Sequence, residues 1–171
     1  SNQNENQRIV GHPANMSGDF ELTQGDILRI LVGQSGFLGS NRPGWGGGGG
    51  TFVAKGSENL PLIVGGGCGG SHTNYSDEYV QNANITENGS NGSAGSGTWS
   101  NGYGAIGGRG GNAAGFFGNG DIGNGSTYQP VAGQGPHTVP MAFINGGLGD
   151  NIGGGFGGGA GVTNTYGGGG G

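Results

Sequence analysis

The chain has 171 residues, of which 50 are glycine and only 9% are charged, whereas an average protein has about 7% glycine and about 25% charged residues. Its net charge is −5 and its five basic residues do not cluster, which argues against nucleic acid or an anionic membrane surface as a partner. No apolar run approaches the roughly 20 residues of a membrane span, so membrane insertion is not predicted either.

The N-terminal part of the chain predicts an arm followed by a hairpin. Residues 1–18 are mostly polar and are expected to form a loosely ordered arm, after which one glycine-rich domain spans residues 19–171. Strands are expected within residues 19–32: polar and apolar residues alternate at 19–22, and an aliphatic run occupies 27–32. The turn between them contains Gly25, which is free to take a positive φ.

A second hairpin is predicted over residues 51–65. Two strand-like runs, Thr51–Lys55 and Leu60–Val64, flank a turn that begins at Gly56. Pro61 has no N–H to donate to a ladder, so its strand is expected to start at or near the edge of a sheet.

The second half of the chain has a different composition. Asn, Ser, Thr and Gly dominate residues 72–126, which also contain five Asn-Gly pairs, so this region is expected to be polar loops. Glycine runs return at 146–171. No window places apolar residues at helical spacing, and glycine disfavours helix. The fold class predicted is mainly β with irregular structure and essentially no α-helix.

The glycine runs can build structure only if they pack together. Five glycines in a polyproline-II-like helix span about 15 Å and have no internal hydrogen bonds. Placed side by side, such helices can bond sideways to one another, and only glycine lets the backbones approach closely enough. We therefore expect short antiparallel strands packed on a bundle of polyglycine-II helices, rigidified by hydrogen bonds between the helices. Flexible spacers are the alternative interpretation.

The runs follow one another in an order that resembles a known domain. The segments are Val32–Gly36, Trp45–Val53, Pro61–Gly70, Gly153–Gly161 and Gly167–Gly171. They resemble the glycine-rich domain of the anaplastic lymphoma kinase and leukocyte tyrosine kinase receptors, which also occurs in bacterial and other secreted proteins. The resemblance implies an extracellular domain in which glycine helices pack against β-strands and serve recognition rather than catalysis. Because this chain has one cysteine where the receptors have several, only the fold is carried over.

The sequence predicts no catalytic, cofactor-binding or metal-binding set. Gly118–Gly123 fits a dinucleotide-binding pattern, but neither the strand before it nor the helix after it is expected. The three histidines lie far apart, and no paired metal-ligand spacing accompanies them. We expect a protein that is not an enzyme and holds no cofactor.

Two groups of residues are candidates for the surface of a secreted protein. Asn-x-Ser/Thr sequons, which are glycosylation acceptors in secreted proteins, occur at Asn15, Asn74, Asn84, Asn88, Asn91 and Asn124. Aromatic residues among small polar ones are typical of adaptable recognition surfaces, and this chain has them at Tyr75, Tyr79, Trp99, Tyr103, Phe116 and Phe117. Capping of the ends of the glycine bundle is the alternative role for these aromatic residues.

Three hypotheses for function follow. The first is a non-enzymatic module, extracellular or at the cell surface, for recognition or adhesion, with a protein or glycan ligand. The second is a structural subunit of an extracellular fibre, which would self-associate through exposed glycine runs and strand edges. The third is an adhesin at the tip of a phage or cell-surface fibre, for which glycine-helix bundles provide an analogy alone.

Overall fold

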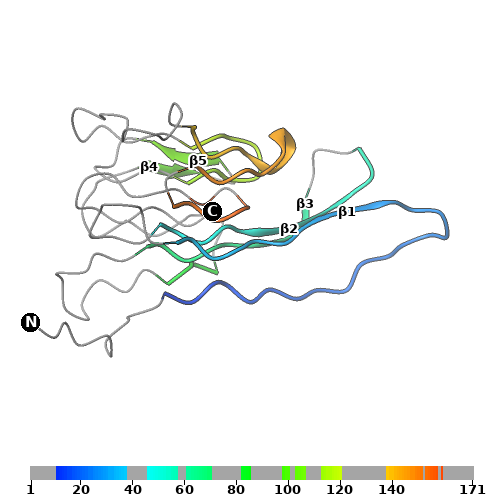
Figure 1. The fold of residues 1–171 in the computed structure, drawn as a ribbon. Coiled ribbons are helices and arrows are strands. Elements are labelled where there is room, and N and C mark those ends of the chain that lie inside the picture. Colours follow the sequence, from blue (N-terminus) through cyan, green and yellow to red (C-terminus); the bar gives the residue numbers. More distant parts are fainter. Residues whose placement is uncertain are drawn as a thin grey trace, which may run out of the picture.

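In the computed structural model of the chain, the described residues form two small antiparallel sheets and one short 3₁₀ helix, with no α-helix among them (Figure 1). The fold is therefore mainly β, as predicted. Within the described ranges, no helix has the length and hydropathy needed to span a bilayer. The described residues are 11–37, 46–57, 61–70, 82–85, 98–100, 103–106, 113–120, 138–151, 153–157 and 159.

The larger sheet has three strands in the order β1-β2-β3, where β1 is Leu28–Leu31, β2 is Thr51–Lys55 and β3 is Pro61–Gly65. Both pairings are antiparallel, and Leu31 lies opposite Phe52. The strands consist largely of aliphatic, aromatic and β-branched residues, which favour a pleated and half-buried surface.

The hairpin predicted over residues 51–65 is present in the structure. Gly56, directly after β2, has a φ of 57°, a left-handed conformation that favours glycine. Pro61 is the first residue of β3, and β3 is an edge strand, in agreement with its missing N–H.

The strand predicted at residues 19–22 is not formed, so this prediction is wrong. Residues 11–22 run as an extended arm on the side of the sheet away from β4, β5 and η2 (Figure 1). Phe20 and Leu22 are 42% and 49% exposed, so the alternation at 19–22 buries no face. The arm is held elsewhere, because the Ala14 N–H donates to the carbonyl of Gly66, just after β3, at 2.9 Å.

The region 72–126, predicted as polar loops, contains the second sheet. Strand β4, Thr98–Ser100, pairs antiparallel with β5, Tyr103–Ile106. Aromatic and β-branched residues in these short runs favour strands, and the Asn-Gly dipeptide between them in the sequence is a hairpin-turn signal. The sequence did not predict these two strands because the residues around them are mostly polar.

The hydrophobic core is small and aromatic. The ring of Phe143, at the start of the 3₁₀ helix η2 (Phe143–Asn145), stacks on Phe116 at a centroid distance of 4.8 Å and lies 5.5 Å from Phe52. Leu31, from β1, belongs to the same buried cluster. One face of the sheet is therefore covered by a few large side chains.

The glycine-rich segments beyond the strands bond sideways to one another. From residues 33–37, the N–H groups of Gln34 and Phe37 donate to the carbonyls of Phe156 and Gly153 at 2.8 and 2.9 Å. The same segment accepts hydrogen bonds from the run 46–50, where the Gly49 N–H donates to the carbonyl of Gln34 at 2.8 Å. A companion bond joins the Gly46 N–H to Phe37, so these contacts repeat every three residues.

Close approach of the backbones explains why these segments are glycine. A Cβ added to Gly49 would lie 1.9 Å from the carbonyl oxygen of Phe156, and one added to Gly46 would lie 1.9 Å from that of Gly153. A Cβ added to Gly36 would lie 2.2 Å from the carbonyl oxygen of Gly46. Real Cβ atoms do not approach backbone atoms so closely, so no other residue fits these positions without movement of the backbone.

This packing predicts opposite outcomes for two neighbouring glycines. We expect Gly49→Ala to lower the free energy of unfolding by about 3 kcal/mol or more, because its methyl group meets backbone that cannot move aside. Gly48→Ala should change it by less than about 1 kcal/mol, since its Cβ would lie 3.5 Å from the nearest atom, the Cys68 sulfur. Urea denaturation of both variants measures the difference, and equal stabilities would contradict the close packing.

Candidate functional site beside strand β1

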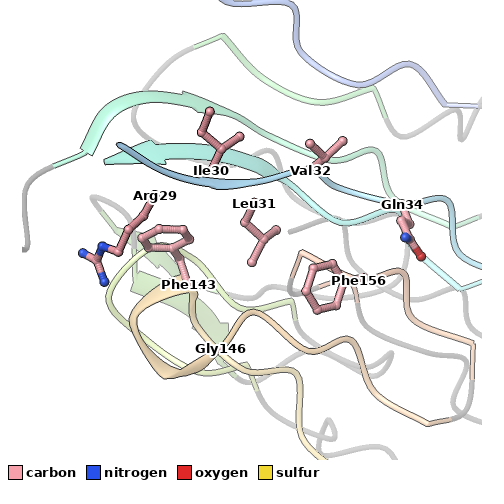
Figure 2. Close-up of a pocket in the computed structure, with 8 residues that line it drawn as sticks. All are labelled: Arg29, Ile30, Leu31, Val32, Gln34, Phe143, Gly146 and Phe156. Carbon is pink, nitrogen blue, oxygen red and sulfur yellow. The ribbon is translucent and has the colours of Figure 1, made fainter. Parts of the chain in front are cut away.

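A pocket of about 470 Å³ opens beside β1 (Figure 2). Arg29 and Leu31 point toward the side chains of Phe143 and Phe156, whereas the side chain of Ile30 points to the other side of the strand. The lining residues are Arg29, Ile30, Leu31, Val32, Gln34, Phe143, Gly146 and Phe156.

The wall opposite β1 is a tight turn. Helix η2 ends at Gly146, whose φ of 106° is left-handed, and its N–H donates to the carbonyl of Phe143. The side-chain oxygen of Asn119 accepts bonds from the Ala142 N–H at 2.9 Å and from the side-chain amide of Asn145 at 2.8 Å. These bonds hold the aromatic ring of Phe143 in place beneath β1.

Arg29 brings positive charge to the pocket. It is the only charged residue among those that line it, and its guanidinium carbon lies 5.3 Å from the centroid of the Phe143 ring. Such cation–π contact fixes a guanidinium on an aromatic face, where its planar donors suit a carboxylate. The pocket therefore combines apolar walls with one positively charged group.

The turn that leads into β1 is held by a carboxylate. A single oxygen of Asp26 accepts bonds from Lys55 Nζ at 2.8 Å, from the Thr23 N–H at 2.7 Å and from the Thr23 hydroxyl at 2.9 Å. The Lys55 contact, followed by the two Thr23 bonds, lowers the pKa of Asp26 from 3.8 to about 2. Gly25 in this turn has a φ of 99°, as the sequence predicted.

The structure describes the side chains of two of the six predicted aromatic residues, Phe116 and Phe117. Phe116 is only 1% exposed and belongs to the core, so the expectation that it is exposed is wrong. Phe117 is half-buried and packs on it at 4.8 Å. Trp99 and Tyr103 lie in β4 and β5; Tyr75 and Tyr79 lie outside the described residues. In the sequence, the two phenylalanines are adjacent and follow two alanines, and this short apolar cluster was the available signal for burial.

Two of the six sequons lie in the described residues. Asn15, on the arm, and Asn84 are both exposed, as a glycan acceptor must be. Occupancy remains a prediction. The remaining sequons, Asn74, Asn88, Asn91 and Asn124, lie outside the described residues.

Sequence reasoning missed the pocket because its two walls are more than 100 residues apart in the chain. One signal was present, since Arg29 is the only charge within the aliphatic run 27–32. Among the described residues, no three His, Cys, Asp or Glu side chains come together as metal ligands would.

Comparison of the chain with protein-family models, with curated proteins and with solved structures found no match. The resemblance to the receptor glycine-rich domain therefore stays a prediction.

The Asp26 carboxylate predicts a pH dependence. Because its pKa is lower in the folded chain than in the unfolded one, its contribution to stability is present above 3.8 and is lost as the pH falls from 3.8 to about 2. Lys55→Met should move the pKa of Asp26 back toward 3.8, whereas Lys55→Arg should keep it low. Carboxyl ¹³C NMR titration measures both, and an unchanged titration in Lys55→Met would contradict the ion pair.

Burial of Phe116 predicts a structural effect for a residue that the sequence placed on the surface. Phe116→Ala should lower the free energy of unfolding by about 3–5 kcal/mol, because it leaves a cavity among the core rings. Leu148→Ala, at a residue that is 52% exposed, should change it by less than about 0.5 kcal/mol. Chemical denaturation distinguishes the two variants, and wild-type stability of Phe116→Ala would contradict the burial of Phe116.

Proposed function

We propose that this chain is a rigid, non-catalytic extracellular module for recognition or adhesion. The observation that carries the proposal is the sideways hydrogen bonding of the glycine-rich segments, in which backbone groups rather than side chains fill the interior. A flexible spacer would leave these groups to water, whereas cross-bonded runs hold the surrounding surface in a fixed geometry.

In this proposal, the segments 33–37 and 46–50 are polyglycine-II helices, and the segment 153–157, in which Gly153 and Gly157 have φ angles of 129° and 104°, packs beside them. Support comes from the three-residue repeat of their contacts, since a helix of this type has three residues per turn and presents the same side to a neighbour at every third residue. Gly46 and Gly49 both approach the segment 153–157, and Gln34 and Phe37 both bond to it. Flexible spacers would show no such repeat.

The ligand in this proposal is a protein or a glycan. The pocket beside β1 supports this idea, because its apolar walls and the Arg29 guanidinium suit a partner that carries both apolar and anionic groups. The extracellular location rests on the exposure of Asn15 and Asn84 within sequons and on the resemblance to secreted domains. A role at the tip of a fibre is a variant of the same proposal.

A fibre subunit is the second candidate. The observation that favours it is the exposed apolar surface around β1, where Ile27, Ile30 and Val32 are 71%, 62% and 64% exposed. Apolar residues beside the edge of a sheet favour association with another chain.

The experiment is a binding assay with the purified chain on immobilised glycans and extracellular-matrix proteins. We expect saturable binding to one ligand class, retained in Gly48→Ala and lost in Gly49→Ala, because the second variant disrupts the glycine packing. Absence of saturable binding, or chemical conversion of the bound ligand detected by mass spectrometry, would overturn the proposal.

Two further measurements accompany this assay. Negative-stain microscopy of the native material separates the candidates, since discrete particles support a module and filaments with a regular repeat support a fibre subunit. Intact mass tests location, because hexose-containing increments above the 16.6 kDa chain would show that the sequons are glycosylated in a secretory pathway.

A further inference from the structure

The two edge strands of the three-stranded sheet, β1 and β3, differ in how well they are protected against pairing with another strand. β3 begins with Pro61, and the register of its pairing with β2 shifts beside Ala54, so Leu62 has no partner in the register. The carbonyl of Gly66, directly after β3, is bonded to the arm. Proline, bulges and covering segments are the usual devices against unwanted strand pairing. β1 contains neither proline nor a register shift.

The alternation of the ladder shows which backbone groups of β1 face outward. The Gly56 N–H donates to the carbonyl of Ile27 at 2.7 Å, so position 27 faces β2. In an antiparallel pair this orientation alternates, which turns positions 29 and 31 toward β2 and the backbone groups of Leu28 and Ile30 away from it. Within the described residues, no backbone bond reaches these outward groups.

Just after β1 this alternation ends, because the Gln34 N–H donates to the carbonyl of Phe156 while the Gln34 carbonyl accepts from the Gly49 N–H, in the run that leads into β2. The open part of the edge is therefore limited to positions 28 and 30. The pocket lies along this open part, because it is lined by residues 29–32.

A segment that matches this edge lies on the arm. Asp19, Phe20, Glu21 and Leu22 are all exposed, and no backbone hydrogen bond is formed by them within the described part of the chain. Acidic and apolar residues alternate in the segment, so a strand of this sequence has one acidic face and one apolar face.

We propose that β1 binds residues 19–22 of a second copy of this chain by antiparallel strand addition. With Phe20 opposite Ile30, the outward groups of β1 form hydrogen-bonded pairs with residues 20 and 22. The same register puts Glu21 of the second copy opposite Arg29, which gives charge complementarity in the pocket.

The two faces of the added strand match the two faces of the sheet in this register. Leu22 comes opposite Leu28, and the apolar face of the segment joins the exposed apolar side chains of the sheet, among which Ile30 is 62% exposed. The acidic face turns to the side that holds Arg29 and the ring of Phe143. Cross-strand pairs of both kinds are stabilising.

A second copy, rather than the same chain, supplies the segment. The arm of each chain is tied beside β3, where the Ala14 N–H bonds to Gly66 and the His12 N–H bonds to the side chain of Asn82 at 2.9 Å. Leaving these contacts would be the cost of closure within one chain. Because the arm and the edge are different surfaces, reciprocal exchange closes a dimer, and one-way exchange builds an open chain of copies.

The test is sedimentation velocity of the full chain over a range of concentrations. We expect a mass that rises with concentration for the wild type. Ile30→Pro and Phe20→Pro should each weaken association about tenfold or more, because each removes an N–H that pairs only between copies. Met16→Pro makes the same change in the arm outside residues 19–22 and should associate like the wild type.

Mixing the two impaired variants makes the test specific. Ile30→Pro retains an intact arm, and Phe20→Pro retains an intact edge, so their mixture should recover association that neither shows alone. Association of Phe20→Pro at wild-type strength would overturn the proposal in favour of pairing between two β1 edges. A wild-type chain that stays monomeric at every concentration would also overturn it.

A crosslinking measurement covers the case in which a proline variant does not fold. A chain with Phe20→Cys and Cys68→Ser is mixed with a chain carrying Ile30→Cys and Cys68→Ser. Directly opposed, hydrogen-bonded residues lie about 5.5 Å apart between Cα atoms, within the range of a disulfide, so oxidation should yield a heterodimer. Replacing Ile30→Cys by Ile27→Cys should abolish it, and equal yields from both would contradict the register.

Discussion

The absence of a side chain at a few positions is the constraint on which this structure depends. Gly46 and Gly49 bring the run 46–50 against residues 153–157 at distances that leave no room for a Cβ. Because the backbones touch, their N–H and C=O groups satisfy one another, which a buried polar group requires. Hydrogen bonds thus take a place that apolar side chains occupy in most domains.

The sheet and the glycine segments depend on each other. The described hydrophobic core consists of a few residues around Phe52, Phe116 and Phe143. Leu31 joins them, since it packs in the core and a Cβ on Gly147 would lie 2.1 Å from its side chain. The chain then leaves β1 directly into residues 33–37, which are bonded to the other glycine segments.

The same arrangement sets the chemistry of the surface. Arg29 lies in a strand that is otherwise aliphatic, and the ring of Phe143 holds its guanidinium beside an open strand edge. The opposite edge begins with Pro61, and the arm bonds to Gly66 directly after it. Within the described residues, the outward backbone groups of β1 therefore have no backbone partner, and the strand carries apolar side chains on one face and positive charge on the other.

The sequence by itself determined the elements whose signals are local. Gly25 and Gly56 at turns, the strand runs after them and Pro61 at an edge follow from backbone geometry that neighbouring residues decide. Only the tertiary structure decided that Phe116 is buried, that residues 19–22 form no strand and that a pocket forms beside Arg29. Each of these depends on which distant segment of the chain packs against the residue. Side-chain type and the alternation of polar and apolar residues do not reveal that.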